Sequence, residues 1–353
     1  MPDQHNTDSA LPHRTLLLSE ADVRALLPMH ECIEVMDEAL RSLSRGDSAM
    51  PLRTVMRTRQ TASGTNAFAC MPAMVGRDAG ASIGAKVISV VPGNLTTAYD
   101  SHIGVVLLFD AEFGRLVAIA DASSITAIRT AAVSGLATRT LARADASTVA
   151  LLGTGVLAMP HLEAMRCVRP VMRVQVWSRT PARADAFVQR ARERTGLDVV
   201  LAGSARDAVR GADVICTITS AGTPVLEGAW LEAGVHVNAV GASVPSAREL
   251  DGAAVAAARL FADRRESTLA EAGDFLMARS EGLVTDAHVL GDLGDVLLGT
   301  IAGRQGAGDI TLFKSLGLAV EDVAAARHLV ERARLAGRGT WMDFGGHRNS
   351  EQH

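Results

Sequence analysis

The chain has 353 residues, of which 48% are hydrophobic and 21% are charged, and its formal net charge is −4. This balance is typical of a folded globular protein and excludes a mainly disordered chain. At about 150 residues per domain, the length predicts two domains. The weak negative charge does not predict a nucleic-acid partner, and the lack of an apolar run of about 18 residues predicts no membrane span.

The N-terminal segment and the cysteines bear on where the protein works. The segment MPDQHNTDSALPHR is polar and lacks the apolar core of a secretory signal, so we expect a disordered tail over residues 1–13. The four cysteines are far apart and form no C-x-x-C pair, which predicts no metal site. Lone thiols fit a reducing compartment, so a cytoplasmic protein is expected.

The first third of the chain predicts two helices followed by a sheet. Ser19 and Asp22 form a capping-box pattern at the start of the first helix, and a second helix is expected over residues 31–45. Between residues 52 and 120, short β-rich runs are separated by Gly, Pro, Asn and Asp, which predicts the strands of one sheet. The last two of these strands are expected to form a hairpin with its turn near Glu112–Gly114. These predicted strands are FACMPAMV, GAKVISVV, IGVVLLFD and RLVAIAD.

The rest of the chain predicts an α/β fold. A long Ala-rich helix is expected over residues 123–143, and strands then alternate with helices, which is typical of a doubly wound parallel sheet. The run GRQGAGD at residues 303–309 predicts a loop, and the sequence LFKSLGLAVEDVAAARHLVERARLAG after it predicts a long helix. The expected strands of the parallel sheet are TVALLG, VQVWS, DVVLA, DVICTIT, VHVNAVGA and ARLFADR.

The most specific local motif follows the strand TVALL and opens a helix. The first glycine of a G-x-G-x-x-A motif permits a tight turn, and the second lets the backbone approach a pyrophosphate. The small last residue lets the helix pack on the strand, and the helix N-terminus stabilises the phosphate charge. A dinucleotide cofactor is therefore predicted rather than a simple tight turn. The motif consists of Gly153, Thr154, Gly155, Val156, Leu157 and Ala158.

The end of the next strand bears on which dinucleotide is bound. An NAD site usually has Asp or Glu about 20 residues after the glycines, to hold the ribose 2′-hydroxyl. Here the strand ends in Trp177, and Ser178, Arg179 and Thr180 follow it without a carboxylate. Hydroxyls and a guanidinium suit a 2′-phosphate. We therefore favour NADP(H), with NAD(H) as the alternative and an ordinary exposed arginine as the simplest reading of Arg179.

Taken together, six segments resemble the ornithine cyclodeaminase/mu-crystallin family of dehydrogenases and imine reductases over residues 15–335. The resemblance implies a Rossmann domain inserted into an α+β domain that binds the substrate and forms a homodimer. It places the NAD(P)-binding domain at residues 131–304 and the substrate and dimerisation domain at residues 14–130 plus 305–343, with a crevice between them for the substrate. The segments are GAKVISVVPGN, SSITAIRTAAVSGLATRTLA, GTGVLA, ADVICTITSAGTPVL, GVHVNAVGASVPSAREL and LFKSLGLAVEDVAAA.

The family acts on α-amino or α-imino acids, whose carboxylate must be held by cations. The matching positions are Arg53, Lys86 and Arg129, each of which could instead be a surface or helix-capping charge. Lys86 could also deliver a proton to the imine nitrogen if burial lowers its pKa. His102 is a second candidate for substrate binding and proton handling, or a hydrogen-bonded turn histidine.

One departure from the family pattern separates two activities. Cyclodeaminase-type members place a catalytic Asp two residues after the glycine that follows the fifth Rossmann strand, and here that position is Ser243, after Gly241. A hydroxyl is a poor general base near neutral pH. The Gly-Ala-Ser form resembles the mu-crystallin-type ketimine reductases, in which Ser243 could orient water or substrate. Its simpler role would be to cap a following helix.

Several further residues are expected beside the cofactor. In doubly wound folds the carboxyl ends of the strands line the cofactor crevice. Asp292 and Asp295, in LGDLGDVL, are expected to cap a helix rather than to act in the site. The expected cofactor neighbours are Thr217, Thr219, Val240, Ser243, Ser315 and Gly317.

The resemblance therefore implies an NAD(P)H-dependent reductase of α-imino acids. Suitable substrates are Δ1-pyrroline-2-carboxylate and Δ1-piperideine-2-carboxylate, which hydride transfer from nicotinamide C4 to the imine carbon converts to L-proline and L-pipecolate. Three alternatives stay open. They are an ornithine cyclodeaminase that releases ammonia, an amino-acid dehydrogenase or reductive aminase, and a non-catalytic ligand-binding protein, against which the retained cations argue.

Overall fold

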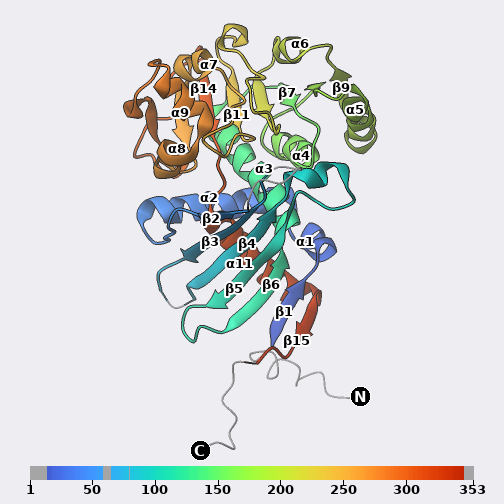
Figure 1. Ribbon diagram of the computed structural model, residues 1–353, viewed down its shortest axis with the longest axis vertical. Helices are drawn as coiled ribbons and strands as arrows, with labels where there is room; N and C mark the ends of the chain where they lie inside the picture. The colour runs from blue at the N-terminus through green and yellow to red at the C-terminus, as the bar shows by residue number, and fades with distance from the viewer. Residues whose placement is uncertain (1–13, 59–64, 79, 346–353) are drawn as a thin grey trace, which may run out of the picture. The chain divides into compact units, whose positions relative to one another are not determined.

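A computed structural model describes residues 14–58, 65–78 and 80–345 (Figure 1). The predicted tail at residues 1–13 lies outside the described residues. The chain forms two compact units. Unit 1 consists of Met1–Pro28, Arg45–Thr126 and Ala319–His353, and unit 2 consists of Met29–Ser44 and Ala127–Leu318.

Unit 1 is built on a seven-stranded sheet in the order β15-β1-β6-β5-β4-β3-β2 (Figure 1). Neighbouring strands are antiparallel, except that β1 runs parallel to β6. The strands are β1 (Thr15–Leu18), β2 (Thr54–Arg57), β3 (Ala67–Val75), β4 (Ser82–Val90), β5 (His102–Asp110), β6 (Leu116–Asp121) and β15 (Thr340–Met342). The helices of this unit are α1 (Glu20–Leu26) and α11 (Ala319–Ala336).

One face of this sheet is covered by α11, which contacts β3, β4 and β5. Because side chains alternate between the two faces of a strand, every second residue packs beneath the helix. Met71, Ile88 and Val106 are buried on this face. Gly84 of β4 is needed there, since a Cβ at this position would meet the Val323 side chain of α11 at 3.0 Å.

Unit 2 contains an eight-stranded sheet in the order β13-β12-β14-β11-β10-β7-β8-β9, in which all neighbouring strands are parallel. The chain winds to one side through β8 and β9 and then returns to β10 beside β7, which confirms the predicted α/β doubly wound fold. The strands are β7 (Thr148–Leu152), β8 (Arg173–Trp177), β9 (Asp198–Leu201), β10 (Val214–Thr217), β11 (His236–Ala239), β12 (Arg259–Ala262), β13 (Val289–Asp292) and β14 (Thr311–Lys314).

Helices accompany the parallel strands of unit 2 (Figure 1). Gly196 ends α5 in the left-handed conformation, with φ 69°, as the Pro-to-Gly spacing of that segment predicts. The start of α3, residues 122–126, belongs to unit 1, and the rest of that helix belongs to unit 2. The helices wholly or mainly in unit 2 are α2 (Met29–Arg45), α3 (Ala122–Leu141), α4 (Ala158–Val168), α5 (Pro181–Thr195), α6 (Ala205–Val209), α7 (Gly252–Ala257), α8 (Arg265–Glu271), α9 (Gly273–Ser280) and α10 (Leu293–Leu298).

Local signals in the sequence are confirmed where they are strongest. Ser19 and Asp22 form the predicted capping box of α1. The hairpin between β5 and β6 turns where expected, and Gly114 supplies its positive φ of 68°. Asp292 is the N-cap of α10, and its N–H donates to the Asp295 carboxylate at 3.4 Å, as the capping prediction requires.

The predicted helix after residue 311 is wrong at its start. Its first residues form β14, which lies between β11 and β12, and the helix begins only at Ala319. A strand buried on both faces reads as a short apolar run, which periodicity alone cannot distinguish from a helix. Residues 305–318 therefore belong to unit 2, although they were expected in the other domain.

The helix α2 also belongs to unit 2 rather than to the expected N-terminal domain. Its contacts with α3 explain this assignment. A Cβ at Gly135 of α3 would lie 3.2 Å from the Ile33 side chain, and the Arg139 guanidinium of α3 binds the Asp37 carboxylate of α2 at 2.8 Å.

Candidate active site

The glycine loop after β7 has the geometry that a bound pyrophosphate requires. Gly153 has φ 117°, and a Cβ there would meet the Ile218 carbonyl oxygen at 2.7 Å. A Cβ at Gly155 would meet no atom of the described residues within 4 Å, so the second glycine faces open space. Ala158 is fully buried at the first turn of α4, and a small residue at this place of the motif lets the helix pack closely on the strand. The loop thus leaves a space at a helix N-terminus that suits an anionic group.

The end of β8 presents an available cation beside this loop. Gly153 N–H donates to the Trp177 carbonyl at 2.8 Å, which fixes the two strand ends together. Arg179 and Thr180 are exposed, and Ser178 is half-buried. The Arg179 guanidinium makes no ion pair or hydrogen bond with any residue that the structure describes. A ligand phosphate could therefore bind it without breaking an internal contact.

The ends of β10 and β11 meet at a fully buried carboxylate that the sequence did not single out. Glu249 accepts hydrogen bonds from the Thr217 hydroxyl at 2.8 Å and from the N–H and hydroxyl of Thr219, both at 2.6 Å. It also accepts from Gly241 N–H at 2.6 Å. Burial and the nearby charge of Asp274 raise the pKa of Glu249, and the Thr219 hydrogen bonds and Lys314 oppose them. Thr217 is fully buried, and its hydroxyl donates its hydrogen bond to Glu249.

Ser243 lies two residues after Gly241 in a segment without a helix. The next helix, α7, begins at Gly252 and is capped by Asp251, so the capping role considered for Ser243 is wrong. The Ser243 side chain is half-buried, and its hydroxyl makes no hydrogen bond with another described residue. Val240, by contrast, is buried at the strand end, with its N–H bonded to the Thr217 carbonyl at 3.0 Å.

The end of β14 holds one of the predicted substrate cations. Ser315 is buried, and its N–H donates to the Ala239 carbonyl at 3.0 Å. Gly317 has φ 79°, and a Cβ there would lie 2.5 Å from Nη1 of Arg129. The Asp263 carboxylate accepts from the N–H of Gly317 at 2.8 Å. Arg129 is therefore a buried guanidinium seated against a turn that only glycine can form, and not a surface charge.

Unit 1 holds Lys86 on the sheet face beneath α11. The Lys86 side chain is buried, and its ammonium forms an ion pair with the fully buried Asp322 carboxylate of α11 at 2.8 Å. The Thr126 hydroxyl lies 3.5 Å from the same nitrogen. The ion pair fixes the Lys86 amino group against α11.

His102 and Arg53 stand in looser surroundings. Strand register places His102 on the same face of the sheet as Lys86, and its Nδ1 lies 3.0 Å from the Ser101 hydroxyl. Burial and then the positive charge of Lys86 lower the pKa of His102, whereas Asp100 acts in the opposite direction. A neutral imidazole near pH 7 is the result. Arg53 is half-buried immediately before β2.

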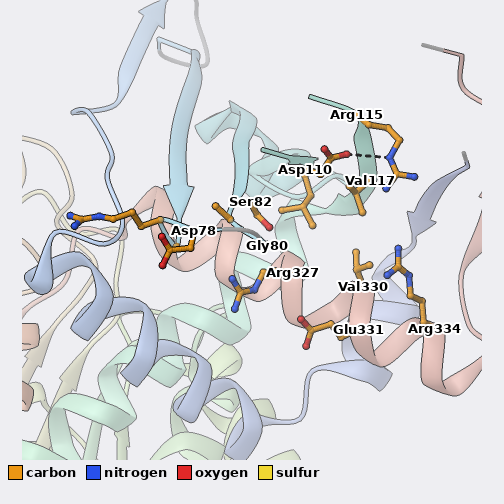
Figure 2. A pocket seen from close by; sticks show the side chains of 14 residues that line it. Asp78, Gly80, Ser82, Asp110, Arg115, Val117, Arg327, Val330, Glu331 and Arg334 are labelled. Atoms are coloured by element: carbon orange, nitrogen blue, oxygen red, sulfur yellow. Dashed lines mark hydrogen bonds and ion pairs between the residues drawn. The ribbon is translucent and has the colours of Figure 1, made fainter. Parts of the chain in front are cut away.

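A cavity of about 570 Å³ also opens in unit 1, but none of the predicted site residues lines it (Figure 2). Arg327, Glu331 and Arg334 project into it from α11, and the paired side chains of Asp110 and Arg115 lie opposite. Its charges of both signs are mostly exposed. Among the described residues, no cluster of three or more His, Cys, Asp or Glu side chains could hold a metal ion. No described helix has the length and apolar character to cross a membrane.

Residues 13–337 match the ornithine cyclodeaminase/mu-crystallin family. The chain belongs to this family. A Δ1-pyrroline-2-carboxylate reductase of Bacillus cereus is 37% identical over 331 residues, which cover 93% of this chain and 100% of that protein. The ketimine reductase mu-crystallin of Mus musculus is 37% identical over 295 residues, which cover 84% of this chain and 90% of that protein.

A solved structure of Thermococcus litoralis Δ1-pyrroline-2-carboxylate reductase in complex with NADH and L-proline has a TM-score of 0.88 to this family member. Its sequence is 34% identical, and the match covers 92% of this chain and 99% of that chain. The predicted family and fold are thereby confirmed.

Sequence reasoning missed the buried partners of the predicted residues in this family member. Asp322 pairs with Lys86, and Glu249 binds the strand ends that carry Thr217 and Thr219. Asp274, which accepts a hydrogen bond from Glu249 N–H, forms a further buried ion pair with Lys314 at 2.7 Å. The only available signal was a charged residue in an apolar segment, as Asp322 is in LGLAVEDVAAA.

Proposed function

We propose that the protein is an NADPH-dependent reductase of α-imino acids, with cyclic imines such as Δ1-pyrroline-2-carboxylate and Δ1-piperideine-2-carboxylate as substrates. The observation that carries this proposal is the hydroxyl of Ser243, which stands where cyclodeaminase-type members of the family have a catalytic carboxylate. Reduction of a ready-made imine needs less proton transfer than oxidation, loss of ammonia and re-reduction. The names of the relatives support the same choice.

The residues of the chain fit the dinucleotide that this activity needs. The open space at Gly155 and the start of α4 would receive the pyrophosphate, and Ser178, Arg179 and Thr180 would receive a 2′-phosphate. The Arg179 guanidinium, which has no partner among the described residues, favours NADP(H), and NAD(H) is the alternative. When bound, the reduced nicotinamide would supply the hydride that attacks the imine carbon.

Three cations are assigned to the substrate carboxylate. Lys86 is paired with Asp322, and Arg129 is held against Gly317, so both are positioned before a substrate arrives. Arg53 would add a third, more adjustable contact. The Ser243 hydroxyl makes no hydrogen bond with another described residue. It would orient the imine or a water that protonates the imine nitrogen. His102, kept neutral beside Lys86, would contact the substrate ring or relay a proton.

A homodimer is the proposed assembly. The sheet face opposite α11 carries three exposed apolar residues in one cross-strand row, Met56, Phe68 and Ile103, with the half-buried Ser89 between Phe68 and Ile103. Met56 is 63% exposed, and Phe68 and Ile103 are each 45% exposed. Large apolar side chains exposed on neighbouring strands favour a subunit contact.

The test is an absorbance assay at 340 nm on the purified protein. The oxidation of NADPH and of NADH is measured with each of three substrates: pyrroline-2-carboxylate, piperideine-2-carboxylate, and pyruvate plus an amine. Ammonia release from ornithine is measured separately. We expect oxidation of NADPH with a cyclic imine. Ammonia from ornithine without any imine reduction would instead identify a cyclodeaminase, and reaction only with pyruvate plus an amine would identify a reductive aminase.

A further inference from the structure

Glu249 joins the ends of two neighbouring parallel strands. Its Oε1 accepts both hydrogen bonds from Thr219, after β10, and its Oε2 accepts from Thr217 and from Gly241 N–H, after β11. Four donors thus converge on one side chain that is fully buried. Because backbone N–H groups from both segments bind the same carboxylate, the two strand ends cannot move apart independently.

The backbone of Glu249 is held as firmly as its side chain. Its N–H and that of Leu250 donate to Oδ1 of Asp274, at 2.7 and 3.0 Å. Oδ2 of Asp274 binds the ammonium of Lys314, at the end of β14, at 2.7 Å. The N–H groups of Val225 and Leu226 donate in turn to the Glu249 carbonyl, at 2.7 and 3.0 Å. The backbone at Glu249 is therefore anchored to Asp274 of α9 and, through Asp274, to Lys314 of β14.

The segment after β11 is fitted closely to this carboxylate. A Cβ at Gly241 would lie 2.0 Å from the Thr219 carbonyl oxygen and 2.6 Å from Oε1 of Glu249. Ser243 follows two residues later in a stretch without helix or strand, so its place depends on where Gly241 is held. The carboxyl ends of such strands form the cofactor crevice in doubly wound folds.

We propose that Glu249 is a positioning residue for the reaction, which sets the ends of β10 and β11 so that Thr219 and Ser243 meet the nicotinamide end of the cofactor and the imine. This inference rests on the proposed function. Stability alone does not account for a charge here, because burying a carboxylate is costly and an apolar side chain of similar size would avoid that cost. What the carboxylate adds is four directional bonds to the two strand ends.

The test replaces Glu249 by Gln. A Gln side chain keeps the volume but offers one acceptor oxygen, so its NH₂ must face the N–H of either Thr219 or Gly241. We expect the Kd for NADPH, measured by cofactor fluorescence, to rise by about 10-fold and kcat to fall by at least about 10-fold. The KM for the imine should change by less than about 3-fold, because Lys86 and its partner Asp322 are untouched.

A matched control uses the opposite end of the same strand. Asp213 precedes β10, and its carboxylate accepts from the N–H groups of Ser147 and Thr148 at 2.9 and 3.0 Å. Asp213→Asn should lower Tm as Glu249→Gln does but leave the Kd for NADPH and kcat unchanged. Thr217→Val removes one hydrogen-bond donor from Glu249 by a nearly isosteric change. It should raise the Kd for NADPH and lower kcat in the same direction as Glu249→Gln but by a smaller factor. This variant tests the inference if Glu249→Gln does not fold.

Two results would overturn the inference. The first is a folded Glu249→Gln, or Thr217→Val where Glu249→Gln does not fold, with wild-type Kd and kcat. The second is an equal loss in Asp213→Asn, which would make the effect one of general stability. If the wild type binds NADPH but reduces no imine, the proposed function fails, and the Kd comparison still decides the role of Glu249. If it binds neither NADPH nor NADH, both proposals fail.

Discussion

The strand ends of unit 2 and the α11-covered sheet face of unit 1 both bury ionisable side chains, but they hold them differently. In unit 2, Glu249 is surrounded by N–H and hydroxyl donors, most of which belong to the segments that follow two strands. In unit 1, Lys86 is held by the opposite charge of Asp322, from side chain to side chain. The first arrangement fixes backbone, and the second fixes one functional group in place.

This difference indicates which properties each region controls. A carboxylate that binds backbone amides determines the shape of a segment, and we expect its loss to affect the cofactor. An ammonium held by a buried carboxylate is a preorganised charge, and we expect its loss to affect the substrate. Substitutions in the two regions should therefore separate cofactor constants from substrate constants.

The largest effect is expected from Lys86→Met. Breaking a buried ion pair costs roughly 3 kcal/mol of unfolding free energy, since the Asp322 charge stays buried. The KM for the imine should rise and kcat/KM should fall by at least about 100-fold, with the Kd for NADPH unchanged. Urea denaturation and the 340 nm assay measure the two effects.

The control is Lys314→Met, which breaks the other buried Lys–Asp pair, that of unit 2. It should cost a similar free energy but weaken the binding of NADPH, because Asp274 supports Glu249. If the two variants changed the same kinetic constants, the contrast between the units would be wrong.

The next effect concerns the glycine loop, where two neighbouring glycines are required for different reasons. Gly155→Ala should leave Tm within about 1 °C, because its Cβ meets no protein atom, but raise the Kd for NADPH by about 10- to 100-fold. Gly153→Ala should unfold at a lower temperature even without cofactor, because its φ is positive and its Cβ meets the Ile218 carbonyl. Thermal melts with and without NADPH distinguish them, and tight NADPH binding by Gly155→Ala would contradict the assignment of the loop.

The sequence predicted the parts of the site that are local in the chain and missed those that depend on distant contacts. The loop from Gly153 to Ala158 and the cation at Arg179 are local patterns, and the sequence identifies them with their surrounding strands. Asp322 and Glu249 could not be predicted, because their partners lie far away along the chain and meet them only in the folded protein. The strand β14 was missed for a related reason: its pairing with β11 and β12 overrides a pattern that locally suits a helix.

A smaller effect is expected at the end of β8. Arg179→Ala should raise the KM for NADPH by about 10-fold and leave that for NADH within about 2-fold, since only NADPH carries the 2′-phosphate. Arg173→Ala, at the start of the same strand and paired with Asp198 at 3.0 Å, serves as the control and should change neither constant. Equal changes for the two cofactors in Arg179→Ala would exclude the choice of NADP(H).

The smallest effect distinguishes the units by the sign of a pH dependence. In unit 2, burial raises the pKa of Asp292 from 3.8 to about 6, with Asp295 and Asp263 adding to it and the Arg265 N–H opposing it. The folded state therefore binds this proton more tightly than the unfolded chain. The stability that this proton binding contributes is complete below about pH 4 and is lost as the pH rises through 6. An asparagine side chain does not titrate, so the free energy of unfolding of Asp292→Asn should rise relative to that of the wild type between pH 4 and pH 7. We expect a difference of about 1 kcal/mol, less than the full pKa shift would give, because Asp292 is partly exposed and solvent screens its charge.

Asp110 in unit 1 should show the opposite sign. Its burial acts to raise its pKa, but the hydrogen bond from Phe113 N–H and the ion pair with Arg115 outweigh it, so the pKa is lowered. This carboxylate stabilises the fold above its unfolded pKa, and the contribution is lost as the pH falls. Asp110→Asn should therefore lose stability relative to the wild type as the pH rises over the acid range. Urea denaturation of both variants and the wild type from pH 3 to pH 7 measures how the difference in unfolding free energy changes with pH. A change of the same sign for both variants would contradict the opposite pKa shifts of Asp292 and Asp110.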